Sequence, residues 1–292
     1  MSKLKKILNK RLRKFYFQRR VYKNKNREII AKRQSKKNGK LNFSGSSILK
    51  HAPKLEDVNT LGYTSLGVVL DQLEVDNLLN SLNKFKCFDG YRPELGTFYA
   101  DKIPEQTHVA NYKREDLVSV KEVMDIANDP KILSFVQEFL YGKPTISTIN
   151  AWWSLGGRND AEHAQLFHRD VDDYKFIKFF IYLTDVGQEN GPHVYVETSA
   201  YDDKFKTIRR FSDEEIEESY GKEKVKYITG KKGEGYFVNT YGIHKGLLPK
   251  EGRRLILQVQ YSINEVGIEE YNPIEIDNAV DYDKYINRLL IK

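Results

Sequence analysis

The feature that most constrains the fold is a change of pattern at Gly142. After it come short runs rich in β-branched and aromatic residues, separated by Gly, Pro, Asn and Asp, as in antiparallel strands. The runs are TISTINAWWSL (145–155), KFIKFFIYLTDV (175–186), PHVYVET (192–198), EGYFVNT (234–240) and RRLILQVQYSI (253–263). They predict a mainly β fold, a β-sandwich or jelly roll (a cupin-like double-stranded β-helix), with its core at about 143–265.

The residues before Gly142 are predicted to brace this core with helices, from about 66 to 142. Apolar positions recur at helical spacing in GVVLDQLEVDNLLNSLNKF and LVSVKEVMDIAN. A third helix is expected after Asp129 as its N-cap, with Pro130 at the first helical position. A helical insert is predicted near 212–221, and residues 41–292 are expected to form one domain.

The charge of the chain is concentrated in its first forty residues. Residues 1–40 carry 17 Lys or Arg and one acid, a net +16, whereas the whole chain is +7 and the remainder therefore −9. Apolar side chains at Leu4, Ile7 or Leu8, Leu12 and Phe15 predict a basic amphipathic helix. A solvated arm, a nucleic-acid arm and a helix on an anionic membrane remain open, and we favour peripheral membrane contact because the acidic body makes nucleic acid a poor partner.

The cysteine content and the hydropathy of the sequence limit the cellular compartments in which the protein is expected. The single cysteine, Cys87, excludes an intrachain disulfide and a Cys-cluster zinc site. We expect a cytoplasmic protein, in contact at most with the inner face of a membrane, since no apolar run reaches spanning length and no signal-peptide pattern is present.

The stretch LFHRDVDDYKF (166–176) contains a His-Arg-Asp that resembles a kinase catalytic loop. A kinase needs Asn five residues after the Asp, and here position 175 is Lys. The upstream Gly-rich loop and the downstream D-F-G are also missing, as is a P-loop. Phosphoryl transfer is therefore excluded.

A metal site explains the same stretch better. His168 and Asp170 are two residues apart, so on a strand they share a face and offer two ligands of a 2-His-1-carboxylate iron site. His244, just after the strand 234–240, is the expected third ligand. His163 and His193 are alternatives that we expect to be ordinary, because one lies in a polar loop and the other has no paired carboxylate.

An open iron site of this type needs a co-substrate, and a guanidinium suits the far carboxylate of 2-oxoglutarate. Arg253 and Arg254 are adjacent, and strand alternation allows only one of them to face inward. Facing Arg253 inward also turns Leu255, Leu257, Val259 and Tyr261 inward. We therefore predict Arg253 as the co-substrate ligand, because the alternative places glutamines in the core.

Further side chains are predicted near the co-substrate. Lys178, Phe180 and Tyr182 share a face, and the Tyr182 hydroxyl is expected to donate to the far carboxylate. Gln165 is expected to contact the metal-bound end. The adjacent Trp152 and Trp153 must face opposite sides, so that one packs the core and the other lines the pocket.

Together, His168-x-Asp170, TDVGQENGPHVYV, His244 followed by Gly246, and Arg253 resemble the phytanoyl-CoA dioxygenase-like branch of iron(II)/2-oxoglutarate oxygenases over about 118–262. The resemblance implies iron(II) on His168, Asp170 and His244, 2-oxoglutarate on Arg253, and O2 as oxidant. ETSA (197–200) replaces the Gly-Ser-His common in relatives, which bears on the substrate side of the pocket.

The implied function is hydroxylation of an unactivated C–H bond in a small, lipid-linked or glycan-linked metabolite. A cupin-like metal enzyme that does not use 2-oxoglutarate, and a non-catalytic binding protein on the same fold, are the rivals.

Overall fold

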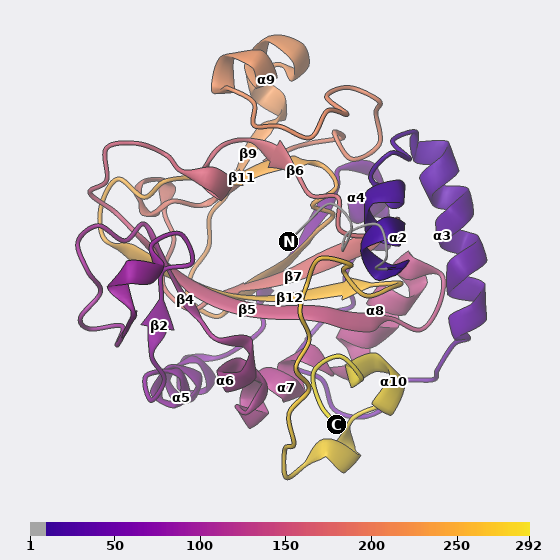
Figure 1. Ribbon diagram of the computed structural model, residues 1–292, viewed down its shortest axis with the longest axis horizontal. Coiled ribbons are helices and arrows are strands. Elements are labelled where there is room, and N and C mark those ends of the chain that lie inside the picture. The colour runs from indigo at the N-terminus through magenta and orange to yellow at the C-terminus, as the bar shows by residue number, and fades with distance from the viewer. Residues whose placement is uncertain (1–9) are drawn as a thin grey trace.

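Two antiparallel sheets face each other in the computed structural model, which describes residues 10–292 (Figure 1). The larger sheet has the strand order β1-β10-β7-β12-β5-β4-β2-β3 and the smaller sheet β6-β11-β8-β9. The large-sheet strands are β1 (Tyr63–Val68), β2 (Cys87–Phe88), β3 (Thr97–Phe98), β4 (Val109–Tyr112), β5 (Thr145–Leu155), β7 (Phe176–Tyr182), β10 (Glu234–Val238) and β12 (Arg253–Ser262). The small-sheet strands are β6 (His168–Arg169), β8 (His193–Val196), β9 (Val225–Ile228) and β11 (Ile243–Gly246). The predicted jelly-roll class is confirmed.

Helices cover the face of the large sheet that points away from the small sheet. They are α5 (Gln72–Leu82), α6 (Arg114–Val118), α7 (Lys121–Ala127), α8 (Pro130–Leu140) and α10 (Lys284–Asn287). Figure 1 shows them below β4, β5 and β12. The predicted cap of α8 is present, because Asp129 accepts hydrogen bonds from the backbone N–H groups of Lys131 and Ile132.

Shorter helical elements complete the chain. They are α4 (Leu55–Thr60), α9 (Asp213–Tyr220), and single 3-10 turns at Pro93–Leu95, His163–Gln165, Gln188–Asn190, Lys222–Lys224 and Ala279–Asp281. The predicted insert is α9, which lies on the outer side of the small sheet in Figure 1.

The main hydrophobic core lies between the large sheet and its helices. On β12 it takes every second residue, namely Leu255, Leu257, Val259 and Tyr261, all buried. The alternate residues Arg254, Ile256, Gln258 and Gln260 point the other way, toward the small sheet, and line a cavity. The predicted direction of β12 is therefore wrong: the apolar face packs against helices, because this sheet is covered on both faces.

The basic N-terminal segment folds onto the body. Helices α2 (Lys10–Gln18) and α3 (Asn24–Asn38) bury Leu12, Phe15 and Ala31. This contradicts a tail separate from the domain, and it removes Leu12 and Phe15 from the stripe expected to face a membrane. Leu4, Ile7 and Leu8 lie outside the described residues.

Polar contacts also fasten this segment. Gln18 Nε2 donates to Val171 O at 2.8 Å, and Ser35 Oγ donates to Leu140 O at 2.5 Å. The Arg11 guanidinium donates to Val266 O at 3.1 Å and to Glu269 O. Residues 10–38 are thus integrated into the packing of the domain.

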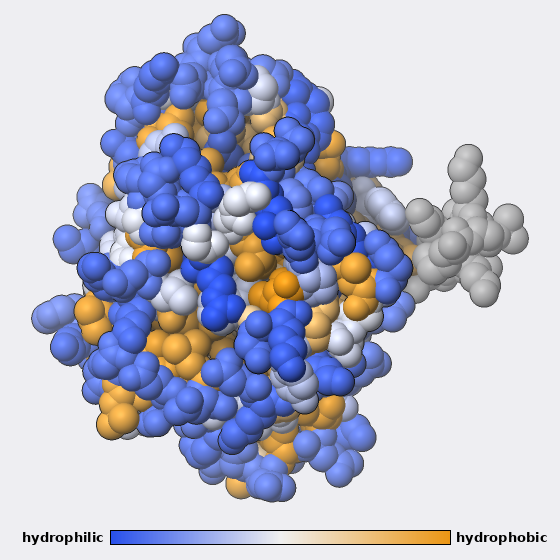
Figure 2. All heavy atoms as spheres, turned by 90° about the vertical axis from the view of Figure 1, so that its left-hand side faces the viewer, coloured by the Kyte–Doolittle hydropathy of each residue, from blue (hydrophilic) through white to orange (hydrophobic). Residues whose placement is uncertain are grey.

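No helix in the described range 10–292 is long and apolar enough to cross a bilayer. The face in Figure 2 is hydrophilic over most of its area, with apolar side chains in small separate groups. Contact with an anionic membrane stays a prediction.

Candidate metal centre

Two neighbouring strands of the small sheet bring the predicted histidines together. His168 on β6 and His244 on β11 are direct register partners, and their ring centroids are 4.3 Å apart. Asp170 follows β6, where its backbone N–H donates to Thr240 O at 3.0 Å. Its carboxylate lies 3.6 Å from His168 Nε2 and 3.4 Å from His244 Nε2. One ligand atom from each residue falls within 4.8 Å of the others, as a shared metal requires.

The hydrogen bonds of the two rings orient them for metal binding. Nδ1 of His168 lies 2.9 Å from Leu166 O, and Nδ1 of His244 lies 3.0 Å from Gly242 O. Each Nδ1 must therefore carry the proton, which leaves the Nε2 lone pairs directed at Asp170. Burial, followed by the nearby His244, lowers the pKa of His168 to about 3, so this ring is neutral, as a ligand must be.

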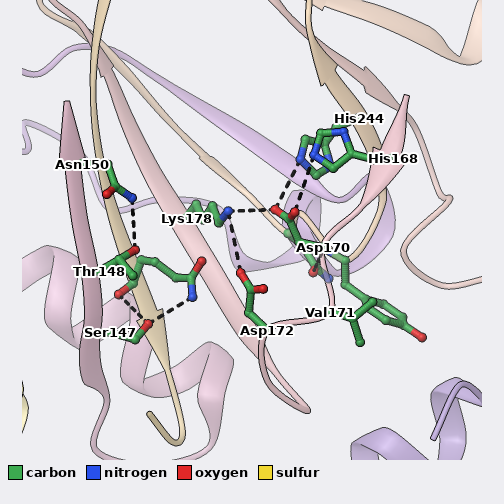
Figure 3. Close-up of polar contacts among 12 residues, drawn as sticks. Ser147, Thr148, Asn150, His168, Asp170, Val171, Asp172, Lys178 and His244 are labelled. Carbon is green, nitrogen blue, oxygen red and sulfur yellow. Dashed lines mark hydrogen bonds and ion pairs between the residues drawn. The ribbon is translucent and has the colours of Figure 1, made fainter. Parts of the chain in front are cut away.

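Asp170 is ionised and held by a cation. Burial opposes its ionisation, but the adjacent Lys178 ammonium holds the pKa of Asp170 well below its usual range. Figure 3 shows Lys178 directed at two carboxylates, with Nζ 2.7 Å from Asp170 Oδ2 and 3.9 Å from Asp172 Oδ2. Burial and the adjacent charge of Asp170 raise the pKa of Asp172 to about 6. Two histidines and one ionised carboxylate with free faces fit a facial iron(II) site.

The three residues border a cavity of about 570 Å³ between the two sheets. Its floor is the inner face of β5, β7 and β12, where cross-strand partners form rows. From one end to the other the β12–β5 pairs are Arg254–Ser154, Ile256–Trp152, Gln258–Asn150 and Gln260–Thr148. The volume is in the usual range for small-molecule sites.

The structure places Arg254, not Arg253, in this cavity. Arg254 is buried, and its guanidinium donates to Ser154 Oγ at 2.9 Å and to Gly191 O. Its Nε has no partner among the described residues. Arg253 is exposed, lies over Trp153 and donates to Ala100 O at 2.6 Å. The prediction of Arg253 as the co-substrate ligand is wrong, because the face of β12 that carries Arg253 packs against the helices and not against the cavity.

Tyr182 shares a face with Lys178 and Phe180, as predicted, but it does not line the cavity. Its hydroxyl donates to Ile228 O at 2.6 Å and accepts from the backbone N–H of His193 at 3.0 Å. Burial raises the pKa of Tyr182. The phenol is therefore occupied in joining the sheets, which contradicts its predicted role as a donor to the co-substrate.

Gln165 is buried in the cavity wall, where it was expected. Its Oε1 accepts from the backbone N–H of Glu162 at 2.8 Å. Its Nε2 is buried without a partner among the described residues. That amide N–H is free to donate to a ligand near the metal centre.

Sequence reasoning missed several wall residues. His193 was expected to be ordinary, yet it is buried in the cavity wall and stacked 5.3 Å from His244, with Nε2 unpartnered in the described chain. His163 also reaches the wall, stacked on Tyr91. Strand alternation on β8 gives the signal for His193, because it places residues 193 and 195 on one face. The tryptophans divide as expected: Trp152 lines the cavity and Trp153 packs in the core.

Comparisons with known proteins support the architecture. No family model and no curated protein matches the chain. Among solved structures it is similar to EctD from S. alaskensis with bound Fe, at 16% identity over 81% of this chain and 85% of that one, with a TM-score of 0.54. It is also similar to HygX from Streptomyces hygroscopicus with nickel, 2-oxoglutarate and hygromycin B bound, at 17% identity over 77% and 92%, with a TM-score of 0.50.

A third similar structure is SnoK, a non-heme alpha ketoglutarate dependent carbocyclase from nogalamycin biosynthesis. It shares 14% identity over 75% of this chain and 86% of that one, with a TM-score of 0.50. At these identities the likeness establishes a shared fold. The chain has the jelly-roll fold of solved structures that hold iron or 2-oxoglutarate, and of an enzyme that depends on alpha ketoglutarate.

Proposed function

We propose that the protein is an iron(II)- and 2-oxoglutarate-dependent oxygenase that hydroxylates an unactivated C–H bond. The observation that carries this is the arrangement of His168, Asp170 and His244 on one wall of a cavity that also receives the buried Arg254. A metal enzyme without 2-oxoglutarate has no need of that arginine. Bound iron would supply the activation of O2, coupled to decarboxylation of 2-oxoglutarate.

The surroundings of the three proposed ligands support the assignment, because each side chain is held in place by a partner of its own. Both histidines are fixed by backbone carbonyls, and Asp170 by its ion pair with Lys178. Three ligands on one side leave positions open for a chelating co-substrate and O2. Oxygen-donor and imidazole ligands without thiolate favour iron over softer alternatives.

Arg254 suits the far carboxylate of 2-oxoglutarate. It is a buried guanidinium whose Nε–H has no partner within residues 10–292, and Ser154 Oγ lies beside it. Burial lowers the pKa of Arg254, but an arginine keeps its charge in a protein. A carboxylate arriving there would gain charge-assisted hydrogen bonds to a buried guanidinium. Gln165 Nε2 is the candidate donor to the metal-bound end.

The narrower resemblance to the phytanoyl-CoA dioxygenase-like branch stays a prediction, as does hydroxylation rather than another oxidative outcome. The intact carboxylate of Asp170 supports hydroxylation over halogenation, because a halide would need that coordination position.

The test is 2-oxoglutarate turnover by the purified full-length chain with iron(II) and O2, measured as succinate formed. We expect succinate with iron(II), and none after chelation or in His244→Ala. His51→Ala, which alters a histidine outside the cavity, is the control and should keep full turnover. Iron binding without any 2-oxoglutarate consumption would favour the cupin-like alternative, and absence of iron binding would favour a binding protein.

A further inference from the structure

The inner face of the large sheet becomes polar on the side of the metal centre away from Arg254. Gln258 and Gln260 on β12 pair with Asn150 and Thr148 on β5, so four hydrogen-bonding side chains lie together on the cavity floor. Gln260 also pairs with Lys178 on β7, and Lys178 contacts Asp170. This polar floor, defined as Thr148, Asn150, Gln258 and Gln260, is therefore level with a metal ligand.

The position of the polar floor assigns it to the substrate, an inference that rests on the proposed function. Gln258 is four residues from Arg254, or roughly 13 Å along the strand at 3.3 Å per residue. The pair Ile256–Trp152 separates the two regions. A co-substrate that bridges Arg254 and the metal would leave the polar floor facing the remaining part of the cavity.

Two side chains of the polar floor, Gln258 and Asn150, have hydrogen-bonding capacity to spare, whereas the Gln260 amide donates to Ser147 Oγ at 3.1 Å. Gln258 is 5% exposed and its amide makes no hydrogen bond within the described residues. The Asn150 amide makes only a long contact of 3.4 Å to Thr148 Oγ1, as Figure 3 shows. Buried amides are nearly always satisfied, by protein or by ligand. An alkyl chain would offer these amides no hydrogen bonds, whereas water or a hydroxyl-bearing ligand would.

Other parts of the cavity wall add a pair of stacked rings and two carboxylates. The rings of Tyr91 and His163 stack with centroids 3.6 Å apart at 4°, and Tyr91 is 54% exposed. Such a surface fits the apolar C–H face of a sugar or cyclitol ring. Asp172 and Glu269 also line the wall, the first beside Lys178 and the second paired with Arg114.

We propose that the substrate is a hydroxyl-rich ring compound, a sugar or a cyclitol or a conjugate that carries one. Each hydroxyl both donates and accepts, and so do the amides of Gln258 and Asn150, so hydroxyls and amides match in pairs. The stacked rings of Tyr91 and His163 take the C–H face of the same unit. A fatty-acyl chain buried against Gln258 and Asn150 would leave their amides without hydrogen-bond partners.

Ligand-observed NMR on the full-length chain loaded with diamagnetic Zn²⁺ and 2-oxoglutarate tests this without turnover. The probes are trehalose and myo-inositol, with decanoate as the alkyl comparison. We expect saturation transfer to at least one of the two polyols and none, or at least tenfold less, to decanoate. Gln258→Leu and Asn150→Leu should each weaken polyol binding about tenfold. Gln188→Leu, on an exposed turn, is the matched control and should bind as wild type.

The signals of 2-oxoglutarate in the same spectra separate the two proposals. If 2-oxoglutarate itself fails to bind, the proposed function fails. If 2-oxoglutarate binds but decanoate is preferred, or neither polyol binds, the substrate class is overturned. Polyol binding that survives unchanged in both leucine variants would also overturn it, because the ligand would then lie away from the polar floor.

Discussion

The two faces of strand β12 are buried to similar degrees but differ in what they do. Toward the helices, Leu255, Leu257, Val259 and Tyr261 are each at most 1% exposed and belong to the main core. Toward the small sheet, Arg254 and Gln258 are also nearly inaccessible, yet they border a cavity. The comparison teaches that burial alone does not identify a core face. Here the polar face of the doubly covered sheet borders a cavity, and the apolar face forms the core.

The largest expected loss of activity comes from substitutions on the cavity wall opposite β12. His168→Ala, Asp170→Ala or His244→Ala should each abolish turnover, since two remaining ligands hold iron poorly. Iron content per chain, measured after anaerobic loading and desalting, should fall with activity. Full turnover in any one of these variants would remove that residue from the metal centre.

The two arginines at the start of β12 sharpen the comparison. Arg254→Ala should strand a co-substrate carboxylate, a loss of about 2–5 kcal/mol, and so raise the KM for 2-oxoglutarate roughly 30-fold or more. Arg253→Ala, on the outer face, should leave that KM nearly unchanged. The measurement is succinate formation over a 2-oxoglutarate titration. The opposite ranking would mean that β12 is turned the other way.

Removal of the N-terminal segment is expected to reduce stability. A chain that starts at Leu41 loses the burial of Leu12, Phe15 and Ala31. Burial of one Leu or Phe contributes about 1.5–3 kcal/mol, so the truncation should lower Tm by several degrees. It also frees residues 264–269, which Arg11 and Lys14 contact. Thermal unfolding measures the effect, and an unchanged Tm would show that α2 and α3 add nothing to the domain.

Neighbouring residues on β12 give the most direct contrast, and one of them, Gln258, gives the smallest expected effect. Leu257→Ala should destabilise the fold by about 2–5 kcal/mol, as is usual for a core leucine. Gln258→Leu should change stability by less than about 1.5 kcal/mol, because it faces a cavity and keeps a similar volume. Urea unfolding monitored by tryptophan fluorescence compares them. Equal losses in both variants would contradict the division of the strand into a core face and a site face.

The grouping of His168, Asp170 and His244 was predictable because a shared metal site imposes a spacing on its ligands. His168 and Asp170 needed only strand alternation, and His244 only a position beside a strand end. The choice between Arg253 and Arg254 failed because alternation identifies two faces but does not say which one covers a cavity. His193 was set aside because it has no paired carboxylate, and Gln258 and Gln260 because an inward direction was expected to bury them in an apolar core rather than beside a cavity.

The N-terminal segment shows a different limit. Its cations and apolar stripe fit a membrane helix and a docked helix equally well, since both bury one face. Only the tertiary contacts of Phe15, Gln18 and Arg11 distinguish them for the described residues.

The measurement that tests the central claim most directly is anaerobic absorption spectroscopy of the full-length chain with iron(II), titrated with 2-oxoglutarate. Chelation of iron(II) by a 2-oxo acid produces a visible charge-transfer band before any turnover. We predict a saturable band with one iron(II) per chain, retained in Arg253→Ala, shifted to higher 2-oxoglutarate concentration in Arg254→Ala, and lost in His244→Ala. A chain that binds iron(II) but gives no band at saturating 2-oxoglutarate would contradict the assignment.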